Sequence, residues 1–182
     1  MAIFPGVAAV LLAACVAPAI VPPMPAAPGA YPASVFFRLQ GRLSVRVGDK
    51  IEIGHIRWAR LPGEERLEIS TPFGGQIAEI VKPANGDVVM RRSQEIVRAK
   101  SIGELTASLL GVPLDMDAIA RWTQGIGLAE DEPVEQQFGN GDTWQVTVER
   151  LRVAGAFRYA SRLSALRGDV VVRLVIDEWQ AE

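Results

Sequence analysis

The sequence predicts a mainly β domain, in which an antiparallel sheet curves into an unclosed barrel and two or three helices cover its mouth. Two observations carry this prediction. Six short apolar-rich runs with strand-like alternation precede any helical pattern, and hairpin patterns return after two amphipathic helices. A single curved sheet can hide its apolar face only by closing or by accepting a plug. A half-closed barrel with helices across its mouth would leave an apolar cavity.

Charge is distributed unevenly along the 182 residues. The chain carries 19 basic and 21 acidic side chains, for a net charge of -2, and residues 1–37 contain none of them. This break separates an N-terminal tail from a charged domain. The acidic balance predicts no basic field that could gather nucleic acid or anionic lipid head groups. We therefore expect no nucleic-acid partner, and we expect any membrane affinity to come from apolar groups.

Residues 1–14 are predicted to be a lipoprotein signal peptide. An apolar core at residues 7–14 ends in small residues, as a secretory signal does before its cleavage point. The sequence Leu-Ala-Ala-Cys at residues 12–15 overlaps the end of this core and resembles the bacterial lipobox. Cys15 is therefore the predicted lipid attachment site. The alternative is an uncleaved membrane helix over residues 2–21, which two prolines would interrupt.

Residues 15–34 are predicted to be the lipid anchor and a Pro-rich tether. Their alanines and prolines favour extended chain over a packed element. Fully extended, the tether would let the domain move up to roughly 50 Å from its anchor. The remaining domain is predicted to occupy residues 35–182.

Strand patterns begin at Phe37. Residues 37–47 alternate strictly between apolar and polar side chains, and Gly48 begins a turn. In the next run the apolar face changes parity around Gly54 and His55, so a β-bulge is expected there. A second turn is expected at residues 61–64. Further short strands are expected at residues 67–69, 77–81, 88–90 and 96–97.

The period then changes from two to about three and a half. Residues 101–111 predict a helix with a capping box formed by Ser101 and Glu104, and residues 115–124 predict a second helix with Gly125 as its C-cap. Residues 134–148 predict a hairpin. A last hairpin is expected to turn at residues 167–169.

The loop at residues 71–76, Thr-Pro-Phe-Gly-Gly-Gln, carries an apolar ring at its tip. Pro72 favours a turn and the glycines permit left-handed backbone angles, so little neighbouring chain can cover Phe73. Two interpretations remain open from the residues alone. Phe73 either folds back as a small core plug or contacts a membrane or a partner.

The apolar periodicities direct one set of side chains to a common side of the domain. This set is predicted to line or border the cavity: Leu43, Ile56, Trp58, Leu67, Ile77, Leu105 and Trp122. The alternative is that these residues simply fill a core, as tryptophans such as Trp58, Trp122 and Trp144 do more often than they line a ligand site.

The sequence lacks the usual catalytic motifs. The phosphate-binding glycine motifs, Gly-x-Ser-x-Gly and His-Glu-x-x-His are all absent. His55 has no second metal ligand at a recognisable spacing and is interpreted as a polar strand residue. We therefore expect neither an enzyme nor a cofactor or metal site.

Several short pieces together resemble one family. They are Leu-Gln-Gly-Arg-Leu at 39–43, Ile-Arg-Trp at 56–58, Leu-Glu-Ile-Ser-Thr-Pro-Phe-Gly at 67–74, Leu-Leu-Gly-Val-Pro-Leu at 109–114, Arg-Trp at 121–122, Trp144, and Ile-Asp-Glu-Trp at 176–179. In order and spacing these pieces resemble the LolB family of outer-membrane lipoprotein receptors. The resemblance implies an unclosed antiparallel barrel of about eleven strands with helices over its opening. It also implies that the loop after the third strand inserts into the membrane, with Phe73 where the family pattern has leucine.

The resemblance further implies a function. Such a receptor would accept lipoproteins from a LolA-type periplasmic carrier, hold their acyl chains in the cavity and insert them into the outer membrane. We expect a monomer, lipid-anchored in the outer membrane and facing the periplasm. The alternative is a lipid-binding or structural outer-membrane lipoprotein with no transfer role.

Overall fold

The computed structural model describes residue 34, residues 36–137 and residues 141–182. The predicted signal peptide, Cys15 and the tether up to residue 33 lie outside the described residues, so the proposed division of the chain stays a prediction. Within the described residues, ten antiparallel strands form a single sheet with the order β6-β5-β4-β3-β2-β1-β10-β9-β8-β7. The strands are β1 (Phe37–Val47), β2 (Lys50–Leu61), β3 (Glu64–Ser70), β4 (Gln76–Pro83), β5 (Val88–Arg92), β6 (Glu95–Ala99), β7 (Pro133–Gln137), β8 (Thr143–Ala154), β9 (Phe157–Arg167) and β10 (Val170–Ala181).

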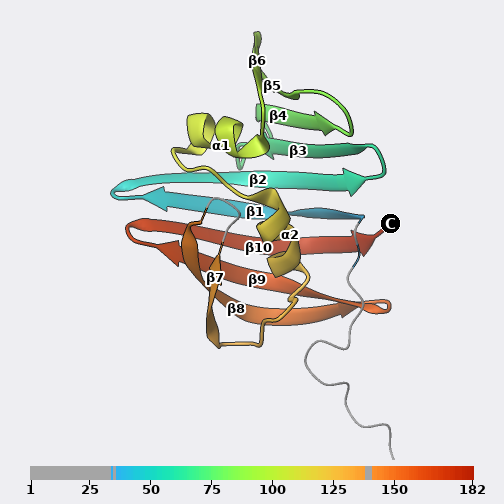
Figure 1. Cartoon of the computed structure of the whole chain (residues 1–182), viewed down its shortest axis with the longest axis vertical. Helices are drawn as coiled ribbons and strands as arrows, with labels where there is room; N and C mark the ends of the chain where they lie inside the picture. The colour runs from blue at the N-terminus through green and yellow to red at the C-terminus, as the bar shows by residue number, and fades with distance from the viewer. Residues whose placement is uncertain (1–33, 35, 138–140) are drawn as a thin grey trace, which may run out of the picture.

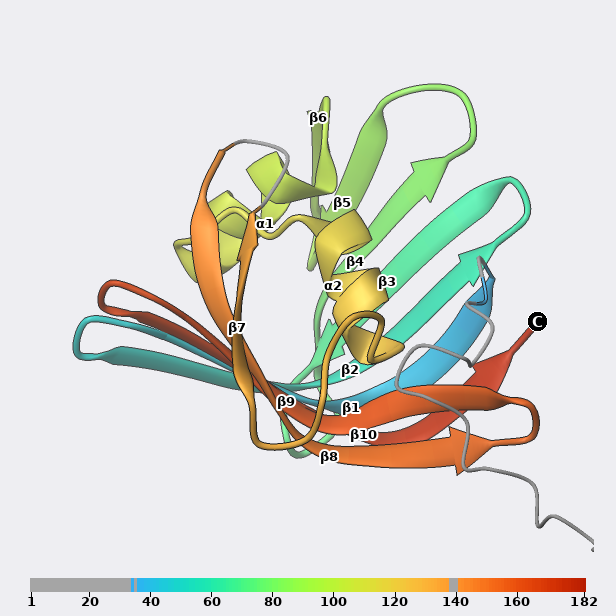
Figure 2. The same cartoon turned by 60° about the horizontal axis from the view of Figure 1, so that its bottom comes forward.

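The sheet curves around two helices that lie on its concave side (Figures 1 and 2). They are α1 (Ile102–Leu110) and α2 (Met116–Thr123), and they connect β6 to β7 across the mouth. Because β6 and β7 end the strand order without pairing with each other, the barrel is unclosed. The predicted fold class is thus confirmed, with ten described strands in place of about eleven.

The alternation of β1 explains how the sheet divides into two faces. Phe37, Leu39 and Val45 are buried on the concave side, whereas Arg38 and Arg42 are exposed on the convex side. β3, β4 and β10 repeat this alternation, whereas β6 and β7, at the two ends of the sheet, contain no buried residue. The concave side, covered by the helices, therefore holds the core, and the convex side carries most of the charged strand residues.

The prediction of a β-bulge at Gly54 and His55 is wrong. β2 pairs with β1 without a register shift, so Gly54 continues the inner face and the preceding isoleucines, Ile51 and Ile53, point outward. A Cβ on Gly54 would lie 2.9 Å from the carbonyl oxygen of Ser70, so glycine lets β3 approach closely here. The two isoleucines belong to a part of β2 that extends beyond its pairing with β3.

Register shifts occur elsewhere in the sheet. β1 and β10 shift between Gln40 and Gly41, where β10 contributes Asp177 as an extra residue. A Cβ on Gly41 would lie 2.2 Å from the Val175 carbonyl oxygen, so this close approach requires glycine. β8 and β9 shift on both sides of Arg150. These bulges bend the strands locally and interrupt their regular pairing between β1 and β8.

The predicted Ser101 caps the start of α1. The start of α2 is capped by Asp115, for which no capping role was predicted, and its C-cap is Gln124 in place of the predicted Gly125. The Ser101 hydroxyl accepts a hydrogen bond from the Glu104 amide at 3.2 Å, and the Asp115 carboxylate accepts from the amides of Asp117 and Ala118. Both helices are short, and no helix in the described part of the chain is long and apolar enough to cross a bilayer.

Candidate functional site

The loop between β3 and β4 holds Phe73 away from the core. The Thr71 amide donates to the Gly75 carbonyl at 2.7 Å, and the Gly74 amide donates back to the Thr71 carbonyl at 2.9 Å. Gly74 has a φ of 88°, which explains the glycine. The Phe73 side chain is 99% exposed. The core-plug interpretation is therefore wrong, because the ring makes no contribution to the core.

An apolar space lies between the sheet and the helices, with a volume of about 30 Å³. Five of the seven predicted cavity residues line it together: Leu43, Ile56, Trp58, Leu67 and Trp122. The remaining lining is Leu110, Leu114, Met116, Ile119, Leu163, Val172 and Leu174. Its walls thus come from the inner face of the sheet and from the helical segment that covers the mouth.

The other two predicted residues lie apart from this space. Ile77 borders a neighbouring pocket of about 110 Å³, which also contacts Leu43 and Leu110. Leu105 is buried in the main core on α1. Trp144 is also buried in the core, where the Arg167 guanidinium lies 4.8 Å from its ring centre.

The apolar space is small for any lipid. A space of this volume holds no more than a few water-sized molecules, which is far less than an acyl chain occupies. The side chains of α2 and its preceding loop, including Met116 and Ile119, fill the region between the layers. An acyl chain can therefore enter only if the helical segment moves away from the sheet.

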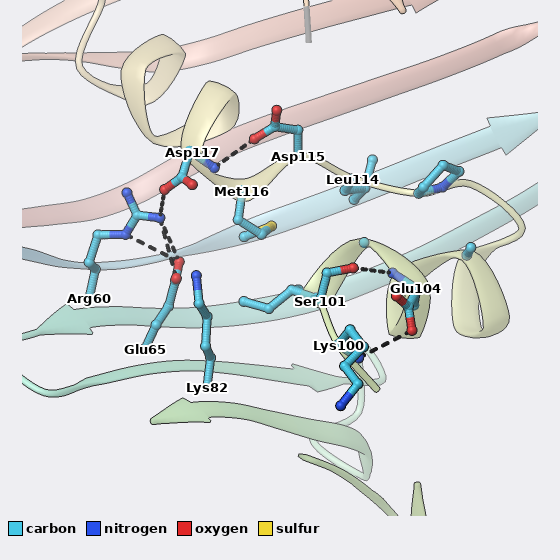
Figure 3. A pocket seen from close by; sticks show the side chains of 14 residues that line it. Arg60, Glu65, Lys82, Lys100, Ser101, Glu104, Leu114, Asp115, Met116 and Asp117 are labelled. Atoms are coloured by element: carbon cyan, nitrogen blue, oxygen red, sulfur yellow. Dashed lines mark hydrogen bonds and ion pairs between the residues drawn. The ribbon is translucent and has the colours of Figure 1, made fainter. Parts of the chain in front are cut away.

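A second pocket opens at the mouth beside this space (Figure 3). Its volume is about 440 Å³, and its lining combines the loop before α2 with the start of α1 and charged residues of β2, β3 and β4. Leu114 and Met116 line both the open pocket and the inner apolar space. These two side chains therefore form the partition between them.

An ion network ties α2 to the sheet next to this partition (Figure 3). Arg60 Nη2 lies 3.1 Å from Glu65 Oε1 and 2.5 Å from Asp117 Oδ1, and Glu65 is buried. Trp58 Nε1 donates to the same Glu65 oxygen at 2.9 Å. The network therefore links a cavity-lining ring to the first turn of the helix that covers the cavity.

Two further contacts fix the wall of the open pocket. The buried Thr106 hydroxyl donates to the Gly103 carbonyl at 3.0 Å and accepts from the Leu114 amide at 2.9 Å, which holds the loop against α1. At the rim, the hydrogen bond from Lys100 to the Asp87 carboxylate raises the pKa of Lys100. A lysine is already a cation at neutral pH, and this contact stabilises the charged form further.

The Arg60 network was missed at the sequence level, although one signal was present. By period-two alternation, Arg60 lies on the same inner face as Trp58 in β2, and Glu65 lies on the same inner face as Leu67 in β3. Arg60 and Glu65 are directly paired across the two strands. Opposite charges at facing inner positions indicate a buried ion pair. Asp117 gave no comparable signal, because its contact depends on where α2 docks.

The comparison with known protein families decides the identity of the domain. The family model "Outer membrane lipoprotein LolB" matches residues 36–179. The chain belongs to the LolB family. This result confirms the resemblance, and it confirms the predicted location as a lipoprotein of the outer membrane.

Individual relatives agree with this family assignment. The outer-membrane lipoprotein LolB of Thiobacillus denitrificans is 29% identical over 172 residues, which cover 90% of each chain. The LolB of Nitrosomonas europaea is 28% identical over 156 residues, covering 80% of this chain and 73% of the relative. Among solved structures, a DUF1329 family protein from Desulfovibrio piger has a TM-score of 0.55 at 10% identity, covering 82% of this chain and 86% of that one. This last likeness shows a shared fold.

Proposed function

We propose that the protein receives lipoproteins from a LolA-type carrier, holds their acyl chains between sheet and helices, and inserts them into the outer membrane. The observation that carries this proposal is the fully exposed ring of Phe73, on a hydrogen-bonded turn, in a chain of the LolB family. Cys15 would carry the lipid that anchors the receptor. Transfer needs no energy source if each site in turn binds the acyl chain more tightly.

The proposed acyl-chain path runs from the open pocket into the inner apolar space. The two are adjacent, and they share Leu114 and the flexible Met116 as lining residues. The helical segment would move aside to admit the chain. Trp58 and Trp122 would then contact the bound lipid, so binding of a lipopeptide should change tryptophan fluorescence.

A second candidate function is that of a structural or lipid-binding lipoprotein with no transfer role. The small volume of the inner space, about 30 Å³, favours it, because the same residues fill the core without a ligand. Failure of the lipid-anchored protein to take a lipoprotein from a LolA-type carrier would support this candidate and contradict the receptor.

The Phe73→Glu variant tests delivery. Burying the ring in a bilayer would contribute about 2 kcal/mol, and a carboxylate at the tip opposes entry into hydrocarbon. We expect Phe73→Glu to fold and accept cargo normally, with a Tm close to that of the wild type, but to release little cargo into vesicles. The assay follows a labelled lipoprotein from carrier to receptor and from receptor to vesicle.

Two matched variants complete this test. Phe73→Leu should retain delivery, because leucine keeps an apolar tip. Ile96→Glu places the same charge on another exposed apolar residue, which is 58% exposed on β6, and should deliver normally. Normal delivery by Phe73→Glu would show that the tip makes no needed membrane contact.

A further inference from the structure

A groove on the convex face gathers four arginines. It has a volume of about 210 Å³ and lies where β1, β10, β9 and β8 are neighbours. Its lining is Arg42, Arg150, Arg152, Arg162, Ser161, Val175, Ile176 and Asp177. We call it the arginine groove. All four arginines are exposed.

The register of the sheet builds this groove from distant parts of the chain. Arg42 pairs with Val175, Val175 with Arg162, and Arg162 with Arg150, so these residues form one row across four strands. Pairing of β9 with β10 ends at this row. The extra residues in β10 and β8 also lie here, and such bulges bend strands apart and open a depression.

The groove carries a positive charge that its own acids do not cancel. Arg42 forms an ion pair with Asp177 at 3.0 Å, while Arg162 lies 3.9 Å from Glu149. Within the described part of the chain, the side chains of Arg150 and Arg152 have no hydrogen bond or ion pair. Two more exposed arginines, Arg46 and Arg173, lie at outward positions of β1 and β10.

This finding corrects an expectation from composition. The net charge of -2 predicted no basic field for anionic lipid. Net charge averages over the whole surface, whereas alternation and register place these arginines on one face. The arginine groove is therefore locally positive although the whole chain has a net negative charge.

A second groove, which includes the carboxylates of Glu68 and Glu178, lies between the arginine groove and the Phe73 loop. It is also lined by Thr71, Pro72 and Gly74 of that loop. Asp177 lines both grooves. The apolar tip and the arginine groove therefore belong to the same convex side of the sheet, opposite the helices.

We propose that the arginine groove binds the phosphate groups of anionic phospholipids in the membrane that Phe73 enters. Arginine presents a planar fork that matches phosphate oxygens, and an apolar tip and a basic groove on the same face are a combination that binds anionic bilayers. The lipid anchor and its tether would keep the groove within reach of these head groups. The proposal rests on the membrane role of Phe73 but concerns a separate contact, which can be measured without cargo.

The test measures how closely the domain approaches the bilayer. The full lipid-anchored protein is placed in vesicles of phosphatidylcholine, or of equal parts phosphatidylcholine and phosphatidylglycerol, each with a trace of dansyl-labelled lipid. Energy transfer from the four tryptophans of the chain to dansyl reports docking. We expect transfer to be higher with phosphatidylglycerol and to fall with added salt.

The decisive variant is Arg150→Glu/Arg152→Glu. Each basic residue at an anionic surface strengthens binding about fivefold, so the docked-to-undocked ratio should fall at least roughly thirtyfold. The matched control is Arg92→Glu/Arg98→Glu, which makes the same charge change on β5 and β6 at the other end of the sheet. The control should dock like the wild type. Circular dichroism and Tm should show that both variants fold.

Other outcomes overturn the proposal. Equal docking of the decisive and control variants, or no response to phosphatidylglycerol, would show that the groove does not bind lipid phosphate. Unchanged docking with weakened uptake from the carrier would assign the groove to a protein partner instead. If the wild type fails to transfer cargo yet shows docking that the decisive variant loses, the receptor function fails while this proposal stands.

Discussion

The two faces of the sheet use the same strands in opposite ways. The inner face buries apolar residues such as Ile56 and Trp58 under the helices, while the outer face exposes charged residues and the Phe73 loop. Each inner position can be recognised within its own strand, because period-two alternation marks it. What an outer position does depends instead on its neighbours from other strands.

Ion pairs on the two faces differ in the same way. The inner Arg60 and Glu65 side chains are 18% and 8% exposed, whereas the outer Arg42 and Asp177 side chains are 53% and 52% exposed. Removing one member of a buried pair leaves a charge without compensation, but exposed pairs contribute little to stability. The inner pair therefore contributes to the stability of the fold, whereas the outer pair mainly sets the charge of the convex surface.

The largest expected effect separates two neighbouring isoleucines of β2. Ile56→Ala should lower the free energy of unfolding by about 2 to 5 kcal/mol, since it removes a buried side chain and leaves a cavity. Ile53→Ala should change it by less than about 0.5 kcal/mol, because Ile53 faces outward and is 58% exposed. Urea unfolding measures both. Comparable losses for the two variants would contradict the register of β2.

A smaller effect is expected from the buried carboxylate. Glu65→Gln removes the charge that faces Arg60 and weakens the acceptor for Trp58 Nε1, and should cost about 1 to 3 kcal/mol. The control is Glu64→Gln, whose side chain is 41% exposed beside Arg66. It should cost less than about 1 kcal/mol. If the control were as costly in urea unfolding, burial would not explain the role of Glu65.

The fold could be predicted wherever a local pattern determined the structure. The strict alternation of Phe37–Val47 and the capping residue Ser101 marked their elements correctly. The bulge in β2 was predicted wrongly because Ile51 and Ile53 were assumed to be core residues. They lie instead where β2 extends past β3, and no local pattern shows the length of a neighbouring strand.

The residues of the site also differ in whether a local sequence pattern could predict them. Turn chemistry left two interpretations of Phe73 open, of which exposure is the one observed, and periodicity within single elements brought together five residues that line the inner apolar space. The arginine groove did not, because Arg42 and Arg150 meet only through the pairing of four strands far apart in sequence. Composition concealed it further, since the acids elsewhere outnumber the bases.

The smallest effect on stability is expected at the outer ion pair, where it should accompany a gain in membrane docking. Asp177→Asn removes an exposed partner of Arg42, so the free energy of unfolding should change by less than about 1 kcal/mol. It also removes a negative charge from the arginine groove, which should raise energy transfer to vesicles that contain phosphatidylglycerol. Asp87→Asn is the control, because it breaks another exposed pair, with Lys100, away from the groove. If Asp177→Asn lost as much stability as Glu65→Gln, ion pairs on the two faces would not differ in their contribution to folding. If its docking were no higher than that of Asp87→Asn, the charge of the groove would not control membrane docking.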